Sequence, residues 1–118
     1  MEIGGPNQAL LLKLLDASSK RRDVLLANLA NTETPGFQRK TVRFEELLQQ
    51  TIAHGGDASR VEPEVVADTA TPARDDGNNV NMELELSGLR ENRLMYDAYT
   101  ALLGTHFDLV RAAIESGR

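Results

Sequence analysis

The sequence predicts a mainly α fold in which two long terminal helices pair as an antiparallel, coiled-coil-like hairpin, with a short helix and a long loose loop between them. Two observations predict it. Apolar residues recur at alternating steps of four and three near both ends of the chain, whereas the middle is rich in Gly, Pro and Asp and has no such period. At 118 residues the chain fits one domain, so 8–33 and 80–116 are expected to form a single helical domain.

The first helix is expected over 8–33. Residues 1–7 precede the period and contain two glycines and a proline, so they read as a flexible lead. A proline at position 35 ends the helix, because it disfavours helical angles in the residue before it. The apolar positions that this helix presents to a partner are Leu11, Leu15, Leu25 and Leu29.

A turn and a short helix are expected over 34–53. The four residues Thr34 to Phe37 fit a type II turn, in which Pro35 takes the second position and Gly36 adopts the positive φ of the third. After a short extended piece, apolar residues at helical spacing predict a helix over 44–53.

The segment 54–79 reads as a long loose loop. It has three glycines and two prolines and no aromatic residue, and only a short strand around Val61, Val65 and Val66 is expected in it. A loop of this length is unusual inside a compact domain, so we expect it to become ordered only against a neighbour in an assembly.

The second long helix, expected over 80–116, has the strongest pattern in the chain. Eight of its ten heptad-spaced positions are apolar. Asn79 or Asn81 can cap its start, and Gly117 suits its end. The apolar positions expected to form its packing interface are Met82, Leu86, Leu89, Tyr96, Leu103, Phe107, Val110 and Ile114.

A lone pair of such helices is expected to be only marginally stable. Burying about ten leucine-sized side chains contributes on the order of 15–30 kcal/mol. Ordering roughly 60 helical residues costs about 1–2 kcal/mol each in backbone entropy before hydrogen bonds are counted. The chain is therefore expected to complete its burial against other chains.

Composition excludes several classes of function. The net charge of −5 and the pI near 5.0 argue against a nucleic-acid partner. No apolar run approaches the roughly 20 residues needed to span a membrane, and the first residues lack the cationic start of a cleaved signal peptide. No H-x-x-x-H or E-x-x-H pattern and no carboxylate cluster at metal-ligand spacing accompanies His54 or His106, and the serines have no nearby histidine to activate them. Neither a metal, a cofactor nor an enzymatic activity is expected.

The end of the first helix holds the most unusual residues. Asn28 and Asn31 stand three apart on one face, although asparagine is a poor helix former. One interpretation is that they cap the last carbonyls of the helix. The other is that their amides bond across to another helix or to the returning turn, as a buried polar residue fixes register in a coiled coil. Phe37 can fold back and close this exit.

These residues carry a family resemblance. Asn28-Leu29-Ala30-Asn31, two further residues and Thr34-Pro35-Gly36-Phe37 resemble the signature N-x-A-N-x-x-T-P-G-[YF] of bacterial flagellar axial proteins. The short spacing between the terminal helices makes the chain most similar to the flagellar basal-body rod protein family, and within it to the proximal rod proteins. Two sister branches of proximal rod protein remain alternatives.

The resemblance implies a structural subunit of the proximal rod, which polymerises through its terminal helices into a drive shaft that transmits torque across the periplasm. It implies other copies of the chain and other rod proteins as partners, together with the rod-to-ring adapter, the membrane-supramembrane ring and the flagellar type III export apparatus. The expected location is the basal body, reached without a cleaved signal peptide. The alternative is a soluble helical-hairpin adaptor that binds a partner helix.

Overall fold

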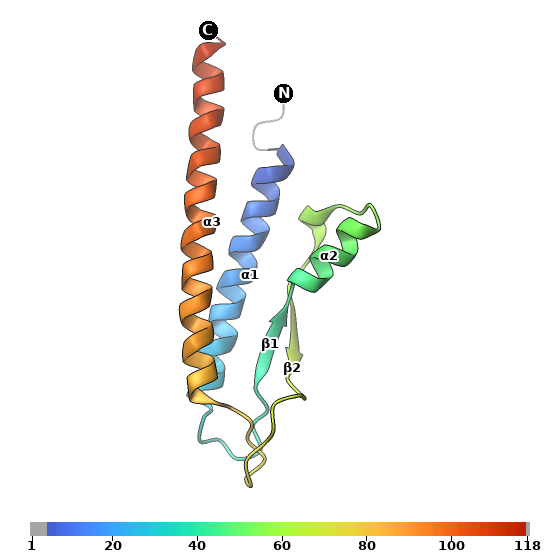
Figure 1. Ribbon diagram of the computed structural model, residues 1–118, viewed down its shortest axis with the longest axis vertical. Helices are drawn as coiled ribbons and strands as arrows, with labels where there is room; N and C mark the ends of the chain where they lie inside the picture. Colours follow the sequence, from blue (N-terminus) through green and yellow to red (C-terminus); the bar gives the residue numbers. More distant parts are fainter. Residues whose placement is uncertain (1–4, 118) are drawn as a thin grey trace.

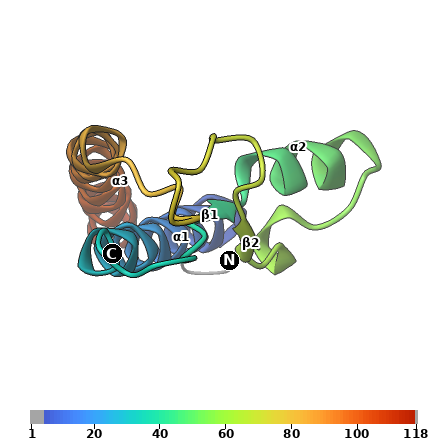
Figure 2. The ribbon, with the colours of Figure 1, turned by 90° about the horizontal axis from the view of Figure 1, so that it is seen from below.

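The computed structural model describes residues 5–117, which form an elongated body of 67 × 29 × 14 Å. Helix α1 lies between the other long helix, α3, and a two-stranded ribbon that carries a short helix, α2 (Figure 1, and from below in Figure 2). The elements in chain order are α1 (Gly5–Ala30), β1 (Lys40–Arg43), α2 (Glu45–Ala53), the 3-10 helix η1 (Ala58–Arg60), β2 (Glu64–Ala67) and α3 (Met82–Ser116).

The two long helices confirm the predicted hairpin. Helix α3 has 35 residues, and the side chain of Asn81 caps it by accepting a hydrogen bond from the Leu84 N–H at 3.2 Å. The helix follows Asn81 without a break and is succeeded by Gly117. It runs antiparallel to α1 and extends beyond the start of α1, so no other helix of the described residues lies beside its last turns (Figure 1).

Helix α1 differs from the expected 8–33 at both ends. It already begins at Gly5, within the segment expected to be a flexible lead, of which residues 1–4 lie outside the described part. Pro6 is compatible with this start, because the first turn of a helix does not need its missing N–H. At the other end the helix stops at Ala30, and residues 31–33 form a turn.

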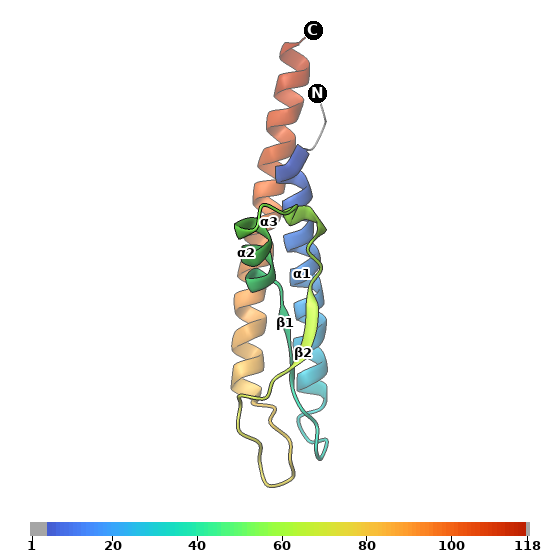
Figure 3. The same cartoon turned by 90° about the vertical axis from the view of Figure 1, so that its right-hand side faces the viewer.

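The apolar core lies between α1 and the ribbon. Four buried side chains form its centre, and Phe44, between β1 and α2, is only 1% exposed. The strands pair antiparallel, with Lys40 opposite Ala67 and Arg43 opposite Glu64, and they lie along α1 with α2 above them (Figure 3). The centre of the core and the half-buried residues around it are Ala17, Val42, Phe44 and Val61, with Leu14, Val24, Leu47 and Leu48.

The segment 54–79 is not the loose loop that composition suggested. It contains η1 and β2, and the ribbon continues beyond β2 because the Asp68 N–H donates to the Arg39 carbonyl at 2.9 Å. Hydrogen bonds from polar side chains hold the rest of it, and such bonds leave no hydrophobic period in the sequence. In the structure, contacts within the same chain hold this segment.

The face that α3 turns to α1 is also not the predicted one. Glu85, Gly88 and Asn92 meet α1, and Gly88 lies so close to Leu25 that a β-carbon on it would be 3.2 Å from the leucine side chain. This face lies roughly 75° around the helix from the apolar seam. Of the predicted interface, Leu25 is buried and Leu11, Leu15, Leu29, Leu89, Leu103 and Val110 are half-buried, whereas Met82, Leu86, Tyr96, Phe107 and Ile114 are exposed.

Candidate functional site at the exit of the first helix

The chain leaves α1 through the turn that the sequence predicts. The Phe37 N–H donates to the Thr34 carbonyl at 3.2 Å, and Gly36 has φ of +75°. These features confirm a type II turn, whose third position strongly favours glycine. Asn31 connects this turn to the helix, because its amide donates to the Ala27 carbonyl at 2.8 Å and its oxygen accepts from the Thr34 hydroxyl at 3.0 Å.

Asn28 joins three elements. Its side chain is 1% exposed, and its oxygen accepts from the Lys40 N–H at 3.0 Å. Its amide donates to the Lys40 carbonyl at 2.8 Å and to Glu85 Oε1 at 2.9 Å. The Asn28 side chain, which lies on α1, therefore pairs with the backbone of Lys40 in β1 as a neighbouring strand would. It also binds Glu85 on α3. Of the two interpretations left open by the sequence, Asn28 follows the second and Asn31 the first, and both make these bonds within their own chain.

Two asparagines just before α3 bind the segment that follows α1. Asn78 is fully buried, and its amide donates to three carbonyls of the turn, those of Asn31 at 2.8 Å, Thr32 at 3.1 Å and Thr34 at 2.8 Å. Its oxygen accepts from the Val80 N–H at 2.7 Å. One carboxamide therefore fixes the end of α1 relative to the start of α3.

Asn79 fixes the ribbon relative to the start of α3. Its oxygen accepts from the Arg39 N–H at 2.6 Å, and its amide donates to the Asp68 carbonyl at 2.9 Å. The Asn79 N–H itself donates to the Phe37 carbonyl at 3.3 Å. We call the residues Asn28, Arg39, Asp68, Asn78, Asn79 and Glu85 the exit network.

A buried arginine lies at the centre of the exit network. Arg39 is 6% exposed and Glu85 is fully buried. The guanidinium donates to Glu85 Oε1 from Nη2 at 2.7 Å and to both carboxylate oxygens from Nε at 3.2 Å, while Nη1 donates to Asp68. Burial alone would lower the pKa of Arg39, but these bonds raise it above its ordinary value. The network therefore holds one buried cation between two carboxylates.

Asp68 makes part of the free energy of unfolding sensitive to acid. The Thr71 hydroxyl and the Arg39 guanidinium lower the pKa of Asp68 well below its usual range. A carboxyl with a lowered folded-state pKa contributes stability that is full above its unfolded pKa of about 3.9 and is lost as pH falls towards the folded value.

We expect Asp68→Asn to be less stable than the unaltered chain at neutral pH, and we expect this difference to shrink as the pH is lowered below about 4. Urea unfolding followed by circular dichroism across this range measures it. A difference that stays constant down to the lowest pH would contradict the assignment of the acid-sensitive contact to Asp68.

The remaining motif residues lie at the surface of the exit. Ala30, Pro35 and Gly36 are exposed, and a β-carbon on Gly36 would meet no atom within 4 Å. Phe37 is half-buried and lines a cleft between α1 and the ribbon together with Val65. The motif thus combines residues that set the backbone path with residues whose outer surface other molecules can reach.

Sequence reasoning did not single out four of the six residues of the exit network, which are Arg39, Asp68, Asn78 and Glu85. One available signal was the cluster of three asparagines at positions 78, 79 and 81, because a helix start needs only one capping side chain. Another was Glu85, which is followed by Asn92 one heptad later, so that polar residues repeat at the spacing of a buried face.

The arrangement suits a mechanical role. Every side chain of the exit network bonds to groups of the same chain, so the network fixes the relative directions of α1, the ribbon and α3. Within residues 5–117, no group of three or more His, Cys, Asp or Glu side chains is placed to hold a metal ion. No helix in that same range is long and apolar enough to cross a membrane.

Comparison with known proteins gives a consistent set of relatives. No family model matches the chain. A protein of Borrelia hermsii is 29% identical, over 87% of this chain and 91% of its own length. Proteins of Escherichia coli and Bacillus subtilis are 27% and 25% identical over similar shares of both chains. All three are named flagellar basal body rod protein FlgB.

Proposed function

We propose that this chain, whose similarity to FlgB proteins along nearly its whole length supports the flagellar basal body rod family, is a structural subunit of the proximal rod. In this role its copies polymerise through the terminal helices into a shaft that transmits torque across the periplasm. The role is structural and involves no reaction. A sister proximal rod position, like that of FlgC, is the alternative within the same assembly.

The observation that carries the proposal is the distribution of exposed apolar side chains on α3. They form two stripes at heptad spacing, one on each side of the face that meets α1 and each about 75° from it. The first stripe is the predicted seam, represented by Met82, Leu86, Tyr96, Phe107 and Ile114, which are 38–52% exposed. The second stripe is Leu84, Met95, Leu102 and Leu109, which are 44–66% exposed.

Two stripes on one helix favour contacts with two neighbours. A helix that is apolar on several faces is usually buried on several faces, and α1 covers only one of them. A tube of laterally packed subunits supplies a neighbour on each side of every α3. The half-buried positions of the predicted interface, including Leu103 and Val110, then become fully covered in the polymer.

The exit network supports the same role. A shaft transmits torque only if each subunit holds its outer part at a fixed angle to its helices. Asn28 and Asn78 connect α1, α3 and the ribbon through bonds within one chain, and the motif turn fixes where the chain leaves the helix layer. Every copy can therefore present the ribbon and α2 in the same direction.

The partners follow from this position. We propose that the chain binds other copies of itself and other rod proteins, with the rod-to-ring adapter and the membrane-supramembrane ring near the base of the rod. The flagellar type III apparatus would export it without cleavage of a signal peptide, and its location would be the periplasmic part of the basal body.

Fractionation of cells tests the proposal. We expect the chain to co-purify with detergent-extracted basal bodies, and we expect the double variant Leu102→Asp with Leu109→Asp to be absent from them and to abolish motility. Leu94→Asp is the matched control, because Leu94 is 70% exposed on the same helix but lies outside both stripes. Recovery of the unaltered chain only in the soluble fraction, as a stable monomer or closed dimer, would instead favour an adaptor that binds a partner helix.

A further inference from the structure

The last turns of α3 project beyond the start of α1. No other helix of residues 5–117 lies beside them (Figure 1). We call residues 107–116 the tip. Phe107 and Ile114, which are one heptad apart and end the first apolar stripe, are 45% and 47% exposed there. The tip therefore carries an apolar face that its own helix pair leaves open.

An apolar cleft lies towards the other end of the hairpin, where α1 meets the motif turn and the ribbon. We call it the motif cleft. It has a volume of about 510 Å³, and its apolar lining is Val24, Ala27, Phe37 and Val65. Phe37 is half-buried and Val65 is 43% exposed. Partly exposed apolar groups that surround a cleft are typical of a site that a further apolar group fills.

Three charged residues line the motif cleft in the order cation, anion, cation. Lys20 and Asp23 lie about one turn apart on α1. Lys40 follows at the level of Asn28, which binds its backbone at 2.8 and 3.0 Å. From Lys20 to Asn28 the helix advances about 12 Å. Neither lysine forms an ion pair among residues 5–117, and Lys20 acts on Glu62 only from a longer distance.

The tip repeats these charges with opposite sign. Asp108, Arg111 and Glu115 lie along one flank of its apolar face, and from the first to the last the helix advances about 10.5 Å. None of the three forms an ion pair within the described part of the chain. The tip is also the negative end of the α3 dipole, next to which lysines are favourable.

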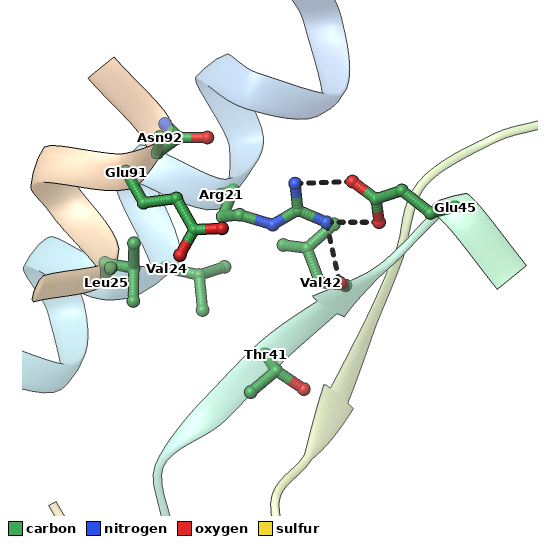
Figure 4. Close-up of a pocket in the computed structure, with 9 residues that line it drawn as sticks. Arg21, Val24, Leu25, Thr41, Val42, Glu45, Glu91 and Asn92 are labelled. Carbon is green, nitrogen blue, oxygen red and sulfur yellow. Dashed lines mark hydrogen bonds and ion pairs between the residues drawn. The ribbon is translucent and has the colours of Figure 1, made fainter. Parts of the chain in front are cut away.

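The cleft drawn in Figure 4 offers no comparable match. Its arginine, Arg21, donates to both oxygens of Glu45 at 2.8 Å and to the Val42 carbonyl at 3.1 Å, so the pair is completed within the chain (Figure 4). The only remaining charge in its lining is Glu91. The motif cleft differs because both of its cations are without a partner at ion-pair distance.

We propose that the tip of one copy of this chain enters the motif cleft of the next copy, where its apolar face covers Phe37 and Val65. The proposal rests on the rod function, which supplies further copies. Tip and cleft lie towards opposite ends of one chain, so the contact is head-to-tail and every pair of copies keeps a free tip and a free cleft. A contact of this kind grows an open helical polymer when its rotation does not close a ring.

The charges fix the direction and register of the contact. Copies in a rod all point the same way, so the tip runs antiparallel to α1 of the neighbour. This direction places Asp108 beside Lys40 and Glu115 beside Lys20, with Arg111 near the middle of the cleft. Exposed ion pairs add little affinity, but a shift by one turn would bring like charges together, which is costly. The two apolar stripes alone do not set this register.

Cysteine pairing tests the contact in assembled rods, because the chain has no cysteine of its own. We expect a variant with Val65→Cys and Ile114→Cys to give a ladder of disulfide-linked dimers, trimers and longer chains when detergent-extracted basal bodies are oxidised. Val65→Cys with Leu94→Cys is the matched control and should give no ladder, because Leu94 is 70% exposed on α3 but lies outside the tip. Dimers alone, or no cross-link in basal bodies that contain the variant, would overturn the proposal.

Charge reversal tests the register. Lys20→Glu with Lys40→Glu should lower the amount of the chain in basal bodies at least about tenfold, because like charges would then face each other across the contact. Asp108→Lys with Glu115→Lys should lower it similarly. All four changes in one chain restore opposite charges and should recover most of the loss. Thermal unfolding of each purified variant, followed by circular dichroism, should stay close to that of the unaltered chain.

A matched control changes the same number of charges elsewhere. Asp16 and Asp75 are exposed acids outside the tip, so Asp16→Lys with Asp75→Lys should leave the amount in basal bodies unchanged. Normal amounts of both charge-reversed double variants, or no recovery when the four changes are combined, would contradict the contact. Absence of the unaltered chain from basal bodies would instead refute the rod function itself, so the two failures are distinguishable.

Discussion

Replacing Glu85 with alanine is expected to lower the free energy of unfolding by about 3–5 kcal/mol, because it leaves the Arg39 charge buried with one of its two carboxylates missing. Asn28 loses the acceptor of one amide hydrogen at the same time. Since small domains are stable by only about 5–15 kcal/mol, the variant should be largely unfolded in modest urea. Chemical unfolding of the purified chain, followed by circular dichroism, measures the loss.

Two further variants separate the buried pair from a general effect of losing an acid. Glu83 lies two residues earlier on α3 and is exposed, so Glu83→Ala should cost no more than about 1 kcal/mol. The triple variant Glu85→Leu, Arg39→Met and Asp68→Asn removes all three charges and should recover much of the loss, as replacement of buried ion pairs by neutral residues often does. A triple variant no more stable than Glu85→Ala would contradict this account of the exit network.

The parts of the fold that depend on local sequence were predictable. The start of α3 needs a capping side chain and Asn81 supplies it, and the turn at Pro35 and Gly36 needs one residue with fixed φ and one with positive φ. These requirements involve residues within four positions of one another. Rules about nearby residues can therefore place the helix, its cap and the turn without knowledge of the rest of the chain.

The side of α3 that contacts α1 was not predictable in the same way. The apolar period of α3 is strong, and it was natural to turn that seam towards α1. In a single chain, however, α1 buries its apolar side against the ribbon, where Phe44 and Val42 are part of the core. The residues of α3 that contact α1 are Glu85, Gly88 and Asn92. A periodic pattern shows that a face will be covered, but it does not say by which partner.

The exit network shows a second limit. Asn28 and Asn31 were marked as unusual, yet one of the two acceptors of the Asn28 amide lies 57 positions away, in a helix with many other acids. A short strand around Val65 and Val66 was expected, and β2 contains both residues, but its pairing with β1 and the contact of Arg39 with Asp68 just after β2 were not. Polar contacts between distant segments leave no period in the sequence, so only the assembled fold reveals them.

The division between the two kinds of contact has a functional meaning. Polar bonds within the chain hold the base of the hairpin, whereas the exposed apolar groups on α3 would contact neighbouring chains in the proposed rod. If both tasks used apolar residues, one chain could satisfy its own stripes and would lose the drive to assemble. Directional bonds at the exit avoid this competition, because their geometry admits only their own partners.

Asn78→Ala is expected to have the other large effect, a loss of about 2–4 kcal/mol. The change leaves the buried Val80 N–H without its acceptor and removes the amide that donates to the turn. The backbone carbonyls of Asn31 and Thr34 still accept from other N–H groups of the turn, so the main cost comes from Val80 and from the lost connection between the two helices. Hydrogen exchange at the Val80 amide should accelerate together with this loss.

Asn78→Asp tests whether the donor, and not the volume, matters. The carboxylate has nearly the same shape, but it would face the three carbonyl oxygens that the amide now binds. It should therefore destabilise the chain more than alanine at neutral pH. The pKa of the new carboxyl should be raised in the folded state, so its penalty should shrink as the pH is lowered from about 7 to 5. Asn81→Ala, which removes only an exposed cap, should cost about 1 kcal/mol and serves as the matched control. If Asn78→Asp were as stable as the unaltered chain, the carboxamide could not be the part that connects the end of α1 to the start of α3.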